Sequence, residues 1–288
     1  MTNCTARVIE DSVAANTGIR LTTLQLRYPR FIHAEFMTHR VFSRNASSSR
    51  AIPVAKVIEQ VRTDPAMPIH WGKNQPGMQA NDALSGDELY LVQEAWRNAA
   101  RAAANFASDM ASNNAHKQVA NRILEPFQFM HVIVTATEWL NFFELRDHED
   151  AEPNIRALAV AMREAMNGST PNVLHQGDWH TPYVSIEKDM LPITNYMLAN
   201  GLTGDENAFL DIALKCSAAR CARVSYLTHD GQQPDVAKDV ELYNRLVGSR
   251  PLHASPIEHQ ATPSLSADEW YGNFRGWVQN RKLIEQSL

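Results

Sequence analysis

Residues 38–50 read Thr-His-Arg-Val-Phe-Ser-Arg-Asn-Ala-Ser-Ser-Ser-Arg, a stretch dominated by arginines and serines. A buried apolar core would not tolerate these charged and hydroxyl groups unless each had a partner. Guanidinium and hydroxyl groups are also the donors that phosphate-bearing ligands require. The stretch therefore predicts a ligand-binding segment, although on its own a polar surface loop whose serines favour turns has the same composition.

A second informative stretch begins with the β-branched run Val-Ile-Val-Thr at residues 132–135, which predicts a buried strand. Thr137 is then the expected N-cap of a helix that carries Asn141 toward Arg146. An arginine at the end of such a helix can reach a binding site and keep its charge. The alternative is an arginine that only meets the partial negative charge at the helix C-terminus.

Two further stretches lie near the carboxyl end of the chain. Residues 218–226 read Ala-Ala-Arg-Cys-Ala-Arg-Val-Ser-Tyr, and residues 252–259 read Leu-His-Ala-Ser-Pro-Ile-Glu-His. Together with the two stretches above, they resemble the flavin-dependent thymidylate synthases, whose signature is Arg-His-Arg-x-x-Ser-x-Asn-Glu-x-Ser-x-Arg. The signature positions kept in this chain are His39, Arg40, Ser43, Asn45, Ser48 and Arg50.

The resemblance implies an enzyme that transfers a one-carbon unit from methylenetetrahydrofolate to C5 of dUMP and gives dTMP. It implies FAD as cofactor and NADPH as reductant, without a protein nucleophile. It also implies a homotetramer whose sites lie between subunits. The implied catalytic residues are Arg146 and Ser48, the nucleotide-binding residues are Glu35, Ser48, Arg50, Arg122 and Arg146, and the flavin-binding residues are His39, Arg40, Ser43, Asn141, His253, Ser255 and Glu258.

The chain departs from the family pattern at several positions. Thr38 and Ala46 replace an arginine and a glutamate of the signature, and Thr135 and Thr137 replace an asparagine and an arginine. Without the glutamate, the pocket is open to another pyrimidine nucleotide such as dCMP or UMP, or to water that would give a hydroxymethylated product. With fewer cationic flavin contacts, a noncatalytic nucleotide-binding protein is the competing hypothesis.

The order of the stretches is also unusual, because in the family the last two precede the signature. We therefore expect a circular permutant, which preserves the same contacts with a different cut point. This predicts that residues 21–27 pair with a strand just after His259. It also predicts that residues 253–259 lie beside the segment that bears His39 and Arg50.

Composition limits the remaining possibilities. The chain has 288 residues, 44% of them apolar, and a net charge of −5, so we expect one α/β domain (α+β) with a mixed sheet flanked by long helices and no binding of polymeric nucleic acid. It lacks a signal pattern and an apolar run of membrane length, which indicates a cytoplasmic protein. We interpret its three cysteines as structural thiols and expect no metal site, since His175 and His180 have no third ligand nearby.

Further elements follow from periodicity and from the helix-ending residues. A strand is expected at 19–28, followed by a helix that Pro29 opens, and a long helix with a buried apolar stripe at 87–111. Other helices are expected at 153–166, at 205–219 and at 235–247. We expect an insertion around 63–86, an irregular segment at 169–204, and a surface helix or subunit contact at 272–282.

Overall fold

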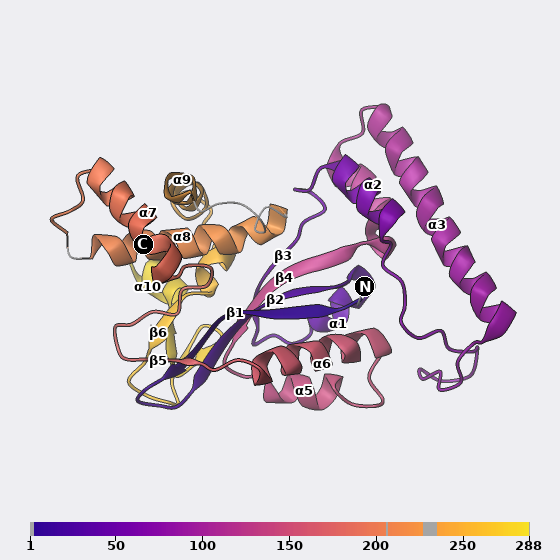
Figure 1. Cartoon of the computed structure of the whole chain (residues 1–288), viewed down its shortest axis with the longest axis horizontal. Coiled ribbons are helices and arrows are strands. Elements are labelled where there is room, and N and C mark those ends of the chain that lie inside the picture. Colours follow the sequence, from indigo (N-terminus) through magenta and orange to yellow (C-terminus); the bar gives the residue numbers. More distant parts are fainter. Residues whose placement is uncertain (1–2, 206, 227–234, 288) are drawn as a thin grey trace.

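The computed structural model describes residues 3–205, 207–226 and 235–287. Its centre is a five-stranded sheet in the order β3-β4-β2-β1-β5 (Figure 1). Its strands are β1 (Thr5–Ala14), β2 (Arg20–Pro29), β3 (Ser43–Ala46), β4 (Phe129–Ala136) and β5 (Asn172–Leu174). β5 runs parallel to β1 and the other pairs are antiparallel, so the sheet is mixed. The expected mixed α/β fold is confirmed.

The two long central strands alternate in character because successive side chains point to opposite faces. Leu24, Leu26, Val132 and Val134 belong to one apolar cluster on one face. The same cluster includes residues of α1 (His33–Phe36), α5 (Leu140–Arg146) and α6 (Pro153–Asn167), and α5 and α6 lie along that side of the sheet in Figure 1. The strand expected at 19–28 and the strand expected at 132–135 are both confirmed.

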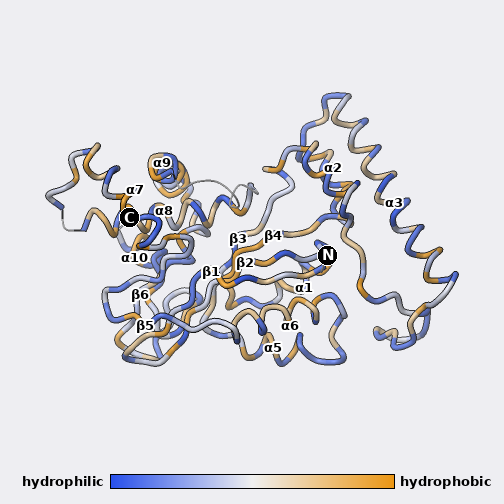
Figure 2. The backbone as a smooth tube through the Cα atoms, viewed as in Figure 1, coloured by the Kyte–Doolittle hydropathy of each residue, from blue (hydrophilic) through white to orange (hydrophobic). Residues whose placement is uncertain are grey.

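The first long excursion from the sheet carries α2 (Val54–Thr63) and α3 (Gly86–Ser112), which pack together beyond the sheet (Figure 1). Between them, residues 64–85 form no helix or strand. The long helix expected at 87–111 is confirmed, but its expected buried stripe is right only in part: Trp96 and Ala103 pack against the apolar cluster that α3 shares with α2. The buried residues of α3 are Ala100, Ala104 and Ala107, whereas Val92 and Phe106 are exposed. Small side chains let the two helices approach. α3 also carries exposed hydrophobic side chains such as Leu91 and Phe106, and hydrophobic stretches are visible along it in Figure 2.

The carboxyl half covers the other face of the sheet. It contains α7 (Ile186–Ala199), α8 (Ala208–Arg223), η3 (Val224–Tyr226), α9 (Val236–Val247) and η4 (Ser255–Glu258). α9 begins at its Asp235 cap and ends at Gly248, as expected. The segment 169–204 is not irregular throughout, because α7 and β5 lie within it. Pro192 lies inside α7, and a proline within a helical pattern conceals the helix from sequence rules.

The last part of the chain does not form a surface helix over 272–282, which was one of two roles expected for it; the other, a subunit contact, stays a prediction. This part of the chain forms β6 (Ala261–Pro263), β7 (Trp270–Tyr271), β8 (Phe274–Arg275) and β9 (Trp277–Gln279), and only α10 (Asn280–Gln286) is helical. Phe274 and Trp277 are fully buried against Leu21 and Ala261. The expected pairing of residues 21–27 with the strand after His259 is also wrong, since β6 pairs with β9 and β2 pairs with β1 and β4.

None of the helices in the described ranges combines the length and the apolar run that a bilayer-spanning segment needs.

Candidate active site

The antiparallel pairing of β3 and β4 determines which predicted site residues meet. Ser43 lies opposite Thr135 at one end of the pair, and Ala46 lies opposite Val132 at the other. The segment before β3 therefore meets the segment after β4, which leads into α5. The segment after β3 meets η2 (Asn121–Phe127), which precedes β4. The predicted residues on these four segments accordingly fall into two groups at opposite ends of β3.

The first group, which we call the Arg146 cluster, consists of Glu35, Thr38, His39 and Arg146. Arg146 Nε donates to His39 Nε2 at 3.1 Å, and Arg146 Nη1 lies 3.1 Å from Glu35 Oε2. Arg146 Nη2 lies 3.5 Å from Thr38 Oγ1. The structure thus brings together Arg146, which is predicted to be catalytic, Glu35, which is predicted to bind the nucleotide, and His39, which is predicted to bind the flavin.

His39 is largely buried in this cluster, with Phe142 edge-on at 4.8 Å between ring centroids and Phe42 stacked at 5.8 Å. Burial and the guanidinium groups of Arg146 and Arg44 lower the pKa of His39 from 6.5 to about 4. The ring is therefore neutral near pH 7. Because Nε2 accepts from Arg146, the neutral ring carries its proton on Nδ1.

Local sequence explains why Glu35 and His39 face the same side. Ile32 and Phe36 are buried, which anchors one side of the short helical segment that begins after Pro29. The chain then turns tightly, with His39 N donating to Phe36 O. Residues four apart lie on the same side of a helical turn, so Glu35 and His39 both reach Arg146.

The second group, the Glu125 cluster, consists of Arg30, Ser49, Arg122 and Glu125. Arg122 Nη1 and Arg30 Nη2 each lie 2.9 Å from Glu125 Oε1, and Ser49 Oγ donates to the same oxygen at 3.2 Å. The predicted residues Ser48 and Arg50 flank Ser49 in sequence, and Arg50 is exposed. Arg30 and Glu125 were not predicted, because neither belongs to the signature.

The segment of residues 253–259 lies beside β3, as expected, because η4 contacts β3. Gln279 Nε2 joins the two elements, since it lies 3.1 Å from Ser43 Oγ and 3.0 Å from the main-chain oxygen of Glu258. The Glu258 carboxylate pairs with Arg281. Sequence reasoning missed Gln279, which lies in the tail that was expected to form a surface helix or a subunit contact.

Polar side chains also form a continuous chain inside the molecule. Ser12 Oγ contacts His180 Nδ1 at 2.8 Å, and His180 Nε2 contacts Thr23 Oγ1 at 2.7 Å. Thr23 contacts Thr135 at 2.7 Å, and Thr135 contacts His259 Nδ1 at 2.8 Å. All five residues are fully buried. Burial lowers the pKa of His180 and His259 to about 3, so both are neutral.

Thr135 and Thr137, which replace two family residues, both make hydrogen bonds within the protein. Thr135 is enclosed between Thr23 and His259 and presents no atom to a ligand. Thr137 does not cap α5 as expected. Its hydroxyl accepts from the main-chain N–H of Arg275, and the N-cap residue is Trp139. Residues near the carboxyl end thus use both hydroxyls: His259 contacts that of Thr135, and Arg275 N–H donates to that of Thr137.

The arginines of residues 218–226 stabilise the carboxyl half. Arg220 and Arg223 each lie 2.8 Å from Asp239, and Arg220 also lies 2.8 Å from Asp189. Both aspartates are almost completely buried. These arginines hold α7, α8 and α9 together. The segment nevertheless reaches the signature, because Ser48 N donates to the main-chain oxygen of Ser225 at 3.1 Å.

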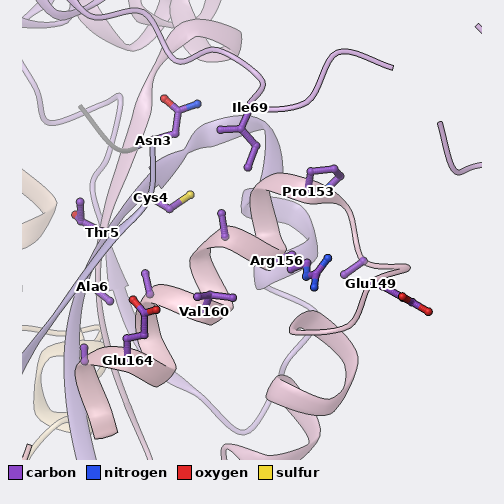
Figure 3. A pocket seen from close by; sticks show the side chains of 14 residues that line it. Asn3, Cys4, Thr5, Ala6, Ile69, Glu149, Pro153, Arg156, Val160 and Glu164 are labelled. Atoms are coloured by element: carbon purple, nitrogen blue, oxygen red, sulfur yellow. The ribbon is translucent and has the colours of Figure 1, made fainter. Parts of the chain in front are cut away.

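Other features of the described residues lie outside these two groups. A groove of about 1160 Å³ between β1 and α6 contains no predicted site residue (Figure 3). Its lining includes Ala157, Val160 and Ala161 from α6. In the described ranges, no three His, Cys, Asp or Glu side chains gather as a metal site would require.

Residues 20–172, more than half of the chain, match the family model described as thymidylate synthase complementing protein, Thy1. The chain belongs to this family. The matched range of the thymidylate synthase complementing protein family contains both ends of β3, with Arg122 and Arg146. It ends before residues 218–226 and 253–259, which the structure nevertheless brings against β3 and its following loop.

No curated protein matches the chain. Among solved structures, two forms of the UMP/dUMP methylase PolB from Streptomyces cacaoi are similar. The form bound to 5-Br dUMP has 15% identity, a TM-score of 0.49, and covers 58% of this chain and 90% of its own. The form bound to 5-Br UMP has 15% identity, a TM-score of 0.47, and covers 58% of this chain and 89% of its own.

Proposed function

We propose that the protein transfers a one-carbon unit from methylenetetrahydrofolate to C5 of dUMP and releases dTMP, with FAD as cofactor and NADPH as reductant. Membership of the thymidylate synthase complementing protein family supports an enzyme of nucleotide metabolism. The observation that carries the proposal is the Arg146 cluster. There a guanidinium at the end of a helix is oriented by Glu35 and by the neutral ring of His39.

This cluster suits a reaction in which negative charge develops on a pyrimidine ring. When C5 attacks the one-carbon unit, a cation beside a ring carbonyl stabilises the transition state, and such fixed electrostatic groups often contribute most to catalysis. Arg146 is 22% exposed, so part of its guanidinium is available to a ligand. Glu35 and His39 fix its position, while Phe42 and Phe142 exclude water from one side.

The residues around this cluster fit a flavin in chemistry. Bound reduced FAD would supply the reducing equivalents of the reaction. Arg40, Asn141, His253 and Ser255 are exposed and keep polar atoms for such a ligand, and Leu140 and Leu145 of α5 are exposed apolar side chains. Ser43 and Glu258 act indirectly in this proposal, because Gln279 and Arg281 already occupy their polar atoms.

We further propose that each site is completed by a second subunit of a homotetramer. Ser43 and Ala46 alone are separated by roughly 10 Å along β3, because a strand rises about 3.3 Å per residue. The Arg146 cluster and the Glu125 cluster lie beyond opposite ends of that strand. One small nucleotide therefore reaches Arg146 of one subunit and Arg50 and Arg122 of another. The exposed apolar side chains of α3 and α5 are consistent with subunit contacts.

Complementation between subunits tests this arrangement. An Arg146→Ala protein and an Arg50→Ala protein should each be inactive, whereas a mixture that has been dissociated and reassembled should regain activity through sites that carry neither change. A mixture as inactive as its components, with assembly verified by native mass spectrometry, would exclude shared sites.

Two measurements test the reaction. The purified protein should be yellow, and NADPH should bleach its flavin absorbance. Turnover with dUMP should give a product whose mass has increased by a methyl group. A colourless protein that binds dUMP but never FAD would favour the competing hypothesis, a noncatalytic nucleotide-binding protein.

Ala46 supports a second candidate function. Its methyl group packs against the apolar cluster of α1, α5 and α6. An alanine here offers a nucleotide no carboxylate. The second candidate function is therefore a related activity of this protein, which would accept UMP or dCMP in place of dUMP or release a hydroxymethylated pyrimidine nucleotide. Competition among dUMP, UMP and dCMP, followed by product mass analysis, distinguishes these outcomes.

A further inference from the structure

We propose that Glu125 is an internal stand-in for the nucleotide phosphate, which must displace it to bind. This inference rests on the proposed function, since it concerns the nucleotide-binding end of that site. It assigns to Glu125 the role of a competing anion that sets the affinity for phosphate-bearing substrates.

The geometry of Glu125 is that of an anion in a receptor. One of its oxygens, Oε1, is approached by Arg30 Nη2 at 2.9 Å, by Arg122 Nη1 at 2.9 Å and by Ser49 Oγ at 3.2 Å. Two guanidinium groups and a hydroxyl that converge on one oxygen are the donor set that binds a phosphate monoester. The carboxylate therefore occupies the position in which a phosphate oxygen would satisfy the same donors.

The receptor is built from three separate elements, and its hydroxyl donor, Ser49, is held in place by a buried amide. Arg30 begins η1 (Arg30–Ile32), Arg122 belongs to η2, and Ser49 lies in the loop after β3. Ser49 is buried, and its main-chain oxygen accepts from Asn121 Nδ2 at 2.7 Å. The hydroxyl donor is consequently fixed whether or not Glu125 remains, whereas the Arg122 side chain is 55% exposed and can follow the anion that replaces the carboxylate.

Charge favours exchange of the carboxylate for a phosphate. Glu125 brings one negative charge to Arg30 and Arg122. Arg50 lies in the loop that carries Ser49, and Lys117 begins α4 (Lys117–Ala120), which directly precedes η2. Lys117 Nζ donates to Ala51 O at 2.9 Å, and Arg50 is exposed. A phosphate monoester carries close to two negative charges near neutral pH, so it satisfies this cationic surface better than one carboxylate.

Glu125 is only 25% exposed, and its side chain is flexible enough to rotate into solvent when the phosphate enters. The exchange costs the two ion pairs of Glu125 and gains those of the phosphate. The affinity for a nucleotide is thereby lower than the same cations would give without Glu125.

The test is isothermal titration of full-length Glu125→Gln with dUMP and with deoxyuridine, the same nucleoside without phosphate. Removal of one competing charge should tighten dUMP binding by about tenfold, which corresponds to the loss of one moderate ion pair. Deoxyuridine binding should remain unchanged. Arg30→Gln should weaken dUMP binding and also leave deoxyuridine binding unchanged.

Glu94→Gln is the matched control, because Glu94 on α3 also pairs with two arginines, Arg97 at 2.8 Å and Arg101 at 3.5 Å. It changes the net charge by the same amount outside the Glu125 cluster. Equal tightening by both variants would mean that net charge causes the effect and would overturn the proposal. Unchanged or weaker dUMP binding by Glu125→Gln, with Glu125→Ala behaving alike and both variants folded, would overturn it as well.

Inorganic phosphate separates this inference from the proposed function. If the unaltered protein binds none of dUMP, UMP and dCMP, the proposed function fails. Tighter binding of inorganic phosphate by Glu125→Gln than by Glu94→Gln would still support the stand-in. If the unaltered protein binds dUMP and the Glu125 variants bind it no more tightly, only the proposed role of Glu125 fails.

Discussion

Arg146 Nε donates a 3.1 Å hydrogen bond to His39 Nε2, across 107 positions of sequence. The bond joins the segment before β3 to the last residue of α5, and it requires an unprotonated Nε2. The lowered pKa of His39, about 4, agrees with that requirement. The orientation of Arg146 therefore depends on His39 remaining neutral.

Arg146→Lys should lower the turnover number by about 100-fold, a typical loss for one electrostatic group at a reacting centre. Lysine has no planar fork, so it cannot contact Glu35 and His39 together while facing a ligand. Initial rates with dUMP, with the flavin content matched, measure the effect. The control is Arg163→Lys on α6, where an exposed arginine pairs with Asp147. Full activity of Arg146→Lys would contradict the assigned role.

Stability should fall as the pH is lowered from about 6.5 toward 3 because of His180 and His259. Their pKa is about 3 in the folded protein and near 6.5 when unfolded, so the unfolded chain binds more protons in this window. Each histidine then contributes up to about 1.4 kcal/mol per pH unit. Urea unfolding at about pH 7 and about pH 5 measures the slope.

His180→Gln should show a shallower dependence of stability on pH than the unaltered protein. The exposed His148 provides the control, and His148→Gln should keep the original slope. Equal slopes for all three proteins would mean that His180 is not neutral in the folded state.

Asp239→Asn should destabilise the protein by about 3–5 kcal/mol, because it removes one charge from a buried ion pair. Asp239 pairs with Arg220 and Arg223 at 2.8 Å each, so the change leaves their charges poorly compensated. Urea unfolding midpoints measure the loss. Asp235→Asn is the control, since asparagine caps a helix about as well as aspartate and α9 should remain intact. Similar midpoints for both variants would refute the prediction.

The three cysteines should not react with a thiol reagent in the folded protein. Cys4, Cys216 and Cys221 are buried, and burial raises the pKa of Cys4 and Cys216 to about 12 and that of Cys221 further. Titration with a chromogenic disulfide should detect all three thiols only after denaturation. Rapid labelling of the native protein, with parallel loss of dUMP turnover, would contradict this prediction and indicate that a cysteine thiolate takes part in the reaction.

The sequence was a good guide where a local pattern had one structural solution. β4 was predictable because its β-branched run suits only a buried strand, and α9 because Asp235 and Gly248 fix its two ends. The Arg146 cluster was largely predictable because its residues belong to recognisable motifs.

The tail shows why other parts were not predictable. Phe274 and Trp277 are three residues apart, a spacing that also suits one face of a helix. Gly272 and Gly276 adopt positive φ angles of 64° and 70°, which turn the chain into short strands instead. The same limit explains Arg30 and Gln279, whose contacts depend on tertiary packing and carry no local signal.

The alternation of side chains along β3 has a consequence for sequence evolution. Ser43 faces Gln279, whereas the next residue, Arg44, reaches the main-chain oxygens of Phe36 and His39 on the other side. Inserting a single residue within this strand would exchange the two faces and misalign everything downstream. The number of residues between His39 and Arg50 is therefore constrained, and homologues should tolerate substitutions in this segment far more readily than changes of its length.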